Sequence, residues 1–441
     1  MTTTRRPRIS PAPAWSFPRY DEGVLDNGLR VWAFHLPGQY VVSAGINLDL
    51  PLAAEPRERE GIASITLHCL DEGTHSHPGS AYTERLENVG AVFTGAATLP
   101  GTQVGIATPV TGLADALPLL AEALTEPALA DDDVARHVGL RRAELVQARA
   151  NSSQLAGALT PGTVFDAGSR ASRPTGGTTV TVSQVTPEAV RDFHARHYSP
   201  AGATLVLAGD FAGADPLALA ETAFGGWTAP GVRAEHPAPE PTTRARRLIG
   251  REGAVQADLR LTAYGIDRID PRWPSLQIAC VAMGGAFQSR LNTVLREKRG
   301  YTYGVHMGAH PLRGAGYITV SGSFRTEVLA AAVTEAHSLL DVSRRPFTDG
   351  EVRRAVRYQT DTAPLRYATA PAVAQQALVL AANGLDPAFV DRNRQEQREV
   401  TAESATAAYQ SLWPADPAML VIGDPALASD LGLEAEPAPK L

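Results

Sequence analysis

Cysteine and long apolar runs are the scarcest features of this sequence. Its 441 residues include two cysteines, Cys69 and Cys280, and each lies in an apolar stretch. Two such residues do not make a disulfide framework, so we expect buried free thiols. No run of about 18 apolar residues occurs, which argues against a membrane-spanning helix. The opening MTTTRRPRIS has no apolar segment after its arginines, so we expect a cytoplasmic protein.

An excess of positive charge is also missing. The formal net charge is −7, which gives no electrostatic footprint for nucleic acid. Charged residues make up 20% of the chain and hydrophobic residues 44%, as in ordinary globular domains, and the length suits two or three of them. Residues 1–18 are rich in Pro and Arg, which predicts a disordered tail. Residues 230–247 (PGVRAEHPAPEPTTRARR) have the composition of a linker.

The chain repeats itself on either side of that linker. The segment Val185–Asp210 resembles Val400–Asp424: both open with Val-Thr-x-Glu and both end with Gly-Asp. A repeat of this length indicates two copies of one α+β unit. We therefore expect an N-terminal half over residues 19–229 and a C-terminal half over residues 248–435.

The most informative stretch is GGAFQSRLNTVLREKRGYTY, residues 284–303. Phe287, Leu291, Val294 and Leu295 have the spacing of one apolar helix face, and Gly300 stands where a helix often ends. Arg296 at the helix end and Tyr303 beyond it, in a predicted strand entry, are both donors that could hold a carbonyl oxygen or an oxyanion. A solvated helix end beside a packed tyrosine would have the same spacing.

This stretch resembles the C-terminal signature of the pitrilysin/insulinase/mitochondrial-processing-peptidase family of zinc metallopeptidases. The matching residues are Ser289-Arg290-Leu291, Leu295-Arg296-Glu297, Gly300 and Tyr303. The resemblance implies that Arg296 and Tyr303 polarise a substrate carbonyl at a zinc held by another domain. It also implies a fold of two like halves, each an antiparallel-rich sheet with helices packed on it, which together form half of a clam-like peptidase chamber.

The family's zinc motif is degraded in this chain. In the family, a helix carries H-x-x-E-H, in which two histidines bind zinc and the glutamate is the general base. The segment GIASITLHCLDEGT, residues 61–74, aligns with that helix. It has Ser64 at the first histidine, Leu67 at the glutamate and His68 at the second histidine. We therefore predict no catalytic zinc in this chain, with His68 as a core or chamber histidine.

The third zinc ligand of the family is a later glutamate, and Glu144 best fits that position. A remaining pair of His68 and Glu144 is too few for a zinc site. His75 and His77 could serve as replacement ligands, although exposed loop histidines would look the same in the sequence.

A predicted strand over residues 90–98 holds the candidate substrate-binding residues Gly95, Ala96, Ala97 and Thr98. In active relatives the matching strand is a sheet edge that pairs with the substrate backbone, and small side chains suit that mode. They suit a tightly packed strand equally well. The following segment, residues 151–179, is rich in Gly, Ser and Pro and is predicted to be a loop over the chamber region.

Three hypotheses follow. The first is a zinc-free subunit of a heterodimeric metallopeptidase, in which a homologous partner carries H-x-x-E-H and the zinc while this chain supplies Arg296 and Tyr303 to hydrolyse a peptide substrate. The second is a non-catalytic structural or peptide-binding member of the family. The third is a metal-dependent hydrolase that acts alone through a rearranged site of His68, His75, His77 and Glu144. None of the three involves nucleic acid or a membrane.

Overall fold

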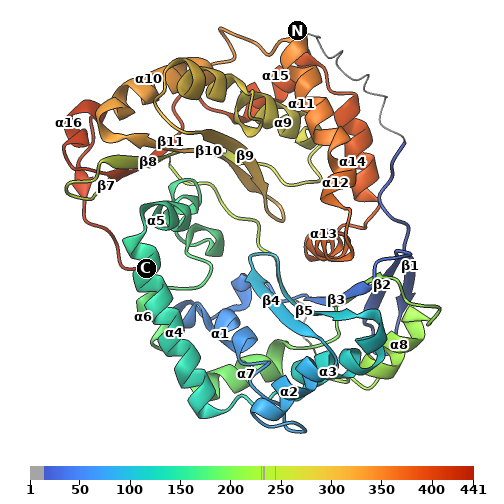
Figure 1. Cartoon of the computed structure of the whole chain (residues 1–441). Helices are drawn as coiled ribbons and strands as arrows, with labels where there is room; N and C mark the ends of the chain where they lie inside the picture. The colour runs from blue at the N-terminus through green and yellow to red at the C-terminus, as the bar shows by residue number, and fades with distance from the viewer. Residues whose placement is uncertain (1–13, 230, 232–233, 244) are drawn as a thin grey trace, which may run out of the picture.

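The computed structural model describes residues 14–229, 231, 234–243 and 245–441 as two halves built on two separate β-sheets (Figure 1). Each sheet has six strands, and helices pack on both of its faces. The predicted fold class, an α+β protein made of two like halves, is confirmed. Among the described residues, no helix has both the length and the apolar composition needed to cross a bilayer.

The N-terminal sheet has the strand order β1-β2-β6-β3-β5-β4. Strands β2 and β6 are parallel and all other neighbours are antiparallel. A hairpin at Asn27-Gly28 joins β1 to β2, and Gly28 has the positive φ, +87°, that such turns require. The strands are β1 (Asp21–Val24), β2 (Arg30–His35), β3 (Val41–Leu48), β4 (Val92–Thr98), β5 (Gly101–Pro109) and β6 (Thr204–Gly209).

The C-terminal sheet repeats this arrangement in the order β12-β7-β11-β8-β10-β9. Its parallel pair β7 and β11 matches the pair β2 and β6 of the N-terminal sheet. The antiparallel pairs β11–β8, β8–β10 and β10–β9 match β6–β3, β3–β5 and β5–β4. The strands are β7 (Arg246–Gly250), β8 (Gln256–Gly265), β9 (Val305–Pro311), β10 (Gly316–Arg325), β11 (Ala418–Gly423) and β12 (Ala435–Glu436). The internal repeat predicted from the sequence is therefore present in three dimensions.

The local chemistry of the repeat explains why its two copies fold alike. Thr186 and Thr401 are the N-cap residues of α7 (Pro187–His197) and α15 (Ala402–Leu412), and each hydroxyl accepts a hydrogen bond from a backbone N–H of the first turn. Such caps fix where a helix begins. Each helix then leads into an entirely buried strand, β6 or β11.

The remaining helices pack around these sheets. In the N-terminal half they are α1 (Ile62–His68), α2 (Ser80–Asn88), α3 (Leu113–Thr125), α4 (Asp131–Ala150), α6 (Thr179–Val182) and α8 (Pro216–Phe224). In the C-terminal half they are α9 (Trp273–Cys280), α10 (Leu329–Leu340), α11 (Asp349–Asp361), α12 (Ala363–Arg366), α14 (Phe389–Arg398) and α16 (Leu427–Leu431). Cys69 and Cys280 are buried free thiols, as predicted.

Two further helices are exchanged between the halves. Helix α13 (Ala370–Ala382), from the C-terminal half, packs on β3 and β6 of the N-terminal sheet. Gly45 makes room for α13, because a Cβ atom at that position would lie only 2.7 Å from the Leu378 side chain. Helix α5 (Ser152–Leu159), from the N-terminal half, packs in return on β8 and β11. The exchange ties the two halves into one body.

Helix α5 corrects the prediction of a loop over residues 151–179. The Asn151 side chain caps α5 by accepting a hydrogen bond from the backbone of Gln154, and Leu155 and Ala156 are fully buried. The small residues of this segment, which favour a loop in sequence terms, allow α5 to approach the other sheet closely.

The ends of the predicted domains also need adjustment. Residues 1–13 of the expected tail, and residues 230, 232, 233 and 244 of the expected linker, lie outside the described part. Residues 14–18 are not a free tail: Phe17 is buried, and its backbone N–H donates to the Asp391 carboxylate at 3.0 Å. Trp15 stacks on Tyr367. Aromatic packing thus holds the chain in place from Trp15 onwards.

Candidate functional site

The signature segment forms a wide helical turn that begins later than the sequence predicts. Residues Asn292–Lys298 (η7) are π-helical, a geometry found often at functional sites. Leu291 and Leu295 are buried, but Phe287 is 64% exposed, so its predicted place on the buried face is wrong. The chain is extended at Ala286, which places Phe287 before the helix begins. Gly300 ends the helix with the predicted left-handed conformation, φ +62°.

Arg296 and Tyr303 line one hollow of about 490 Å³. The Arg296 guanidinium lies 4.0 Å from the centre of the Phe287 ring, a cation–π contact that restricts its orientation. Tyr303 is 95% exposed and lies in the loop before β9, not in a strand. A packed tyrosine is therefore excluded, and the Tyr303 hydroxyl is open to a ligand.

The same hollow contains polar residues that the sequence analysis missed. Asp258 and Arg260 of β8 lie 3.8 Å apart at its wall, and Arg260 also donates to the Ser153 hydroxyl of α5 at 3.3 Å. Burial raises the pKa of Asp258 and lowers the pKa of Arg260, each against the effect of the other. The alternation of ADLRLT along β8 could have indicated that Asp258 and Arg260 share a face. His306 of β9 completes this wall.

The degraded zinc motif lies on α1, where the residues do not fit a zinc ion. Leu67 is 3% exposed, and it packs so closely under β4 that a Cβ at Gly95 would lie 2.6 Å from it. His68 is exposed and stacks on the His137 ring, with ring centres 5.8 Å apart. An apolar side chain thus fills the place of the general base. Ser64 is half-buried.

The expected third ligand has a different role. The Glu144 side chain is 63% exposed and pairs with Arg141 at 3.0 Å. His137, two helical turns before Glu144 on the same face of α4, is the residue that actually meets His68, and its Nε2 lies 2.7 Å from Glu72. This seven-residue spacing was the one signal that could have identified His137.

The structure does not assemble the rearranged metal site either. His77 Nδ1 lies 2.8 Å from the Glu122 carboxylate, and His75 is an exposed loop residue. Across the described ranges, no group of three or more His, Cys, Asp or Glu side chains is placed to hold a metal ion.

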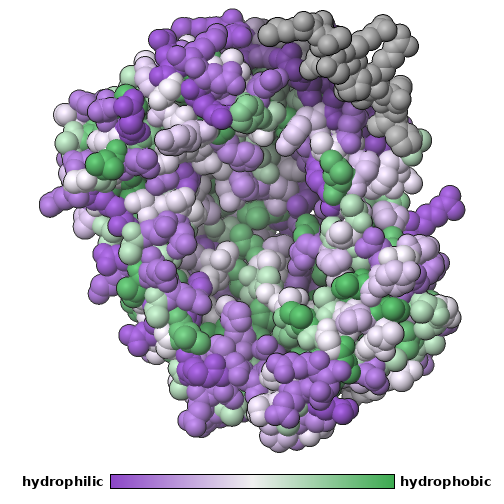
Figure 2. Space-filling view, viewed as in Figure 1, coloured by the Kyte–Doolittle hydropathy of each residue, from purple (hydrophilic) through white to green (hydrophobic). Residues whose placement is uncertain are grey.

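The candidate substrate-binding strand β4 lies at the open edge of the N-terminal sheet. It pairs only with β5, so its other side has unpaired backbone groups. Gly95 and Ala96 are exposed, whereas Ala97 and Thr98 are half-buried. Figure 2 shows that the molecule is hollowed between its two halves, with apolar and weakly polar side chains inside and a hydrophilic rim.

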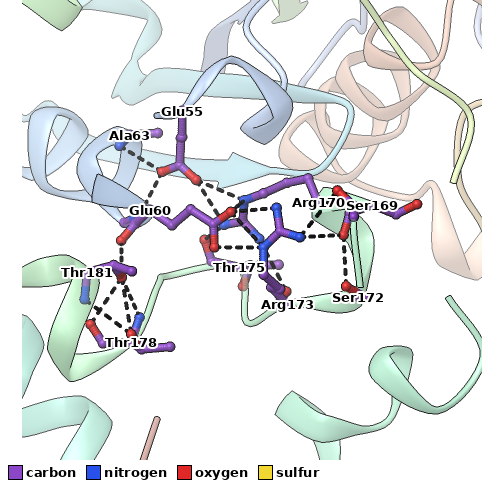
Figure 3. Close-up of polar contacts among 12 residues, drawn as sticks. Glu55, Glu60, Ala63, Ser169, Arg170, Ser172, Arg173, Thr175, Thr178 and Thr181 are labelled. Atoms are coloured by element: carbon purple, nitrogen blue, oxygen red, sulfur yellow. Dashed lines mark hydrogen bonds and ion pairs between the residues drawn. The ribbon is translucent and has the colours of Figure 1, made fainter. Parts of the chain in front are cut away.

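A buried ion-pair network, which the sequence analysis missed, fixes the start of α1 (Figure 3). The Glu55 carboxylate accepts hydrogen bonds from the backbone N–H groups of Gly61 and Ala63 at 2.9 and 3.1 Å. Arg170 donates to Glu55 at 2.9 Å, and Arg173 pairs with Glu60 at 2.7 Å. Burial raises the pKa of Glu55 against the opposing effect of Arg170. The network holds the segment after α5 against α1.

Comparison with known proteins gives a consistent result. Residues 30–172 match the family described as insulinase (peptidase family M16), and residues 184–358 match the description "peptidase M16 inactive domain". An uncharacterized zinc protease of Streptomyces coelicolor is 26% identical over 341 residues, covering 75% of this chain and 74% of that protein. Human cytochrome b-c1 complex subunit 1 is 24% identical over 318 residues, covering 72% and 64%.

Solved structures share the fold. A peptidase M16 inactive domain from Pseudomonas fluorescens superimposes with a TM-score of 0.84 at 21% identity, over 92% of this chain and 98% of that one. A protease from Helicobacter pylori gives 0.82 at 15% identity, over 92% and 100%. The chain belongs to peptidase family M16.

Proposed function

We propose that this chain is the zinc-free subunit of a heterodimeric M16 metallopeptidase. The observation that carries the proposal is the hollow in which the Tyr303 hydroxyl is open and Arg296 is oriented by Phe287. On α1, by contrast, the base position is filled by buried Leu67. A homologous partner with an intact H-x-x-E-H helix would supply the zinc and the general base.

The role of this chain is to hold the reacting carbonyl. The Tyr303 O–H and the Arg296 N–H groups would donate to the carbonyl oxygen of the peptide and then to the oxyanion that forms from it. Removing one such donor typically costs about 3–4 kcal/mol of transition-state stabilisation. Closure of the chamber by the partner would exclude water and strengthen both hydrogen bonds.

The substrate is an unfolded peptide that can lie extended inside the chamber. The open edge of β4, with the small residues Gly95 and Ala96 exposed, supports backbone pairing with such a peptide. Ala97 and Thr98 would continue that pairing towards the β4–β5 turn.

The first test is to purify a tagged form of the chain from its own cells, weigh the intact complex and measure its zinc content. The proposal expects one zinc for each pair of unlike chains, together with peptidase activity that the isolated chain lacks. A zinc-free assembly of this chain alone would contradict it.

The second candidate is a structural role without chemistry, favoured by the similarity to cytochrome b-c1 complex subunit 1. On that reading Arg296 and Tyr303 have no substrate, and replacing them changes neither the assembly nor any activity of it. The mass of the complex and the activity of the Arg296 variant described below separate the two functions.

A further inference from the structure

A hollow of about 260 Å³ in the C-terminal half is lined by three arginines. Arg268 comes from the segment between β8 and α9, Arg366 from the end of α12 and Arg394 from α14. The other polar lining residues are neutral glutamines, an asparagine, a tyrosine and a tryptophan, and no Asp, Glu or His side chain lines it. We call it the arginine pocket.

The three guanidinium groups bond only to neutral oxygen atoms. Arg268 donates to the Pro311 carbonyl at 3.4 Å, and Arg366 donates to the Thr362 hydroxyl at 3.1 Å. Arg394 donates to two backbone carbonyls, at 3.0 and 2.8 Å. Within the described part of the chain, none of the three has a carboxylate within the 4.0 Å of an ion pair. Arg394 is buried, Arg268 is half-buried and Arg366 is exposed. Withdrawing a cation from water without a bonded countercharge is costly, so the pocket favours an anion.

Two of the arginines, Arg268 and Arg366, act on the same neighbouring side chain, Tyr367. Burial raises the pKa of Tyr367, and Arg366 and Arg268 both act to lower it. Burial also lowers the pKa of Arg268, while Asp267 opposes this from beyond ion-pair distance. Asp391 and Asp361 act to raise the pKa of Arg394 in the same way. The positive charge of the pocket is therefore offset only by carboxylates that lie beyond ion-pair distance.

Two buried polar atoms at the pocket lack partners. Trp273 is 4% exposed, and its Nε1–H donor has no acceptor; the Asn393 Oδ1 atom has no donor. Both residues line the arginine pocket. A side-chain amide can turn to present its N–H groups, so a ligand with acceptor oxygens would satisfy the tryptophan and the asparagine as well as the arginines.

Three neighbouring hollows follow β9 from the Arg296 and Tyr303 hollow to the arginine pocket. The first of them shares His306 with the next one along β9, which in turn shares Gln277, Ala309 and Arg366 with the arginine pocket. From Val305 to Pro311 the strand spans about 20 Å, or about six residues of an extended peptide.

We propose that the arginine pocket binds a carboxylate of the peptide substrate, carried about six residues from the bond held at Arg296 and Tyr303. The inference rests on the proposed function for the position of that bond, but the affinity of the pocket for a carboxylate does not. A planar carboxylate matches the forked donors of arginine, and the pocket volume fits one side chain or one chain terminus.

The test uses the full chain without any partner and three fluorescein-labelled peptides of about ten Ala, Ser and Gly residues. One carries a single Glu with a blocked C-terminus, the second carries Gln in its place, and the third is the Gln peptide with a free C-terminal carboxylate. Fluorescence anisotropy measures their affinities for the wild type and for the Arg268→Gln/Arg366→Gln variant. Arg392→Gln is the control, since Arg392 lies on α14 but pairs with Asp386 outside the pocket.

The wild type should bind the Glu peptide or the free-carboxylate peptide at least about tenfold more tightly than the blocked Gln peptide, because charge-assisted hydrogen bonds exceed neutral ones. The double variant should lose this preference and the control should keep it, with equal thermal unfolding of all three proteins. Equal binding of all peptides by the wild type, or a preference that survives in the double variant, overturns the proposal. If the wild type shows the carboxylate preference but the complex with Arg296→Ala has normal activity, only the proposed function is overturned.

Discussion

The two halves of this molecule share a scaffold and differ in what lies beside their open edge strands. Beside β4, helix α1 presents buried Leu67 and a stacked His68. Beside β9, η7 and the loop that leads into β9 present Arg296 and exposed Tyr303. The same six-strand order supports both. The two halves thus share a fold but differ in the side chains that could do chemistry on it.

Both halves contain buried carboxylate–arginine pairs, and breaking the Glu55–Arg170 pair of the N-terminal half should give the largest stability change. Glu55→Leu leaves buried Arg170 with only its longer 3.6 Å contact to Glu60. It also removes the acceptor for the start of α1. We expect a loss of about 3–5 kcal/mol in the free energy of unfolding, measured by urea denaturation. The Glu55→Leu/Arg170→Met double variant should recover much of this loss. A double variant no more stable than the single one would contradict the uncompensated-charge explanation.

The second-largest effect should be on activity, which should depend on Arg296 of the C-terminal half and not on Ser64 of the N-terminal half. In the purified complex, Arg296→Ala is expected to lower kcat about 100- to 1000-fold, because it removes one donor to the oxyanion. Arg299→Ala is the matched control, since Arg299 lies on the same segment but pairs with Glu335 at the surface. In the N-terminal half, Ser64→Ala should leave kcat unchanged. A loss of activity in the Ser64 variant would show that α1 takes part in the reaction.

Acidification should remove stability through the Glu351–Arg290 pair of the C-terminal half, which is the opposite of its effect at Glu55. Burial raises the pKa of Glu351, but hydrogen bonds from Arg290 and Thr348 outweigh it and hold this pKa at about 2. A lowered pKa stabilises the protein above the unfolded value near 4, and this contribution of roughly 2–3 kcal/mol is lost as the pH falls towards 2. For Glu55, whose pKa is raised, acidification does not remove stability in this way.

The unfolding free energy measured between about pH 5 and pH 2 tests this contrast. Glu351→Gln should flatten the acid loss, and Glu55→Gln should not. Equal slopes for the two variants would show that the pairs behave alike.

The smallest difference concerns the repeated N-caps. Thr186→Ala and Thr401→Ala should each cost about 1 kcal/mol, because each removes one hydrogen bond to the first turn of α7 or α15. Thermal unfolding of both variants measures whether the two copies are energetically equivalent. A cost confined to one cap would show that the halves have diverged in their scaffold as well as in their sites.

Sequence patterns account for the parts of the fold that depend on neighbouring residues. The Asn27-Gly28 turn, the strands on either side of it and the repeated Thr-capped helices follow from turn chemistry, alternation and capping. The candidate site was half predictable. The segment with Arg296 and Tyr303 was identified, but the exposure of Phe287 and its contact with Arg296 were not, since they depend on where the helix begins.

The sequence by itself determined that this chain has two α+β copies. It also predicted Ser64, Leu67 and His68 at the positions of a zinc motif, with Arg296 and Tyr303 as site residues. These are local or repeated patterns, which a linear reading can detect. Only the tertiary structure decided that α5 and α13 exchange halves, that Leu67 packs under Gly95 and that three arginines meet in one pocket. Such contacts join residues far apart in the chain, and packing alone selects them.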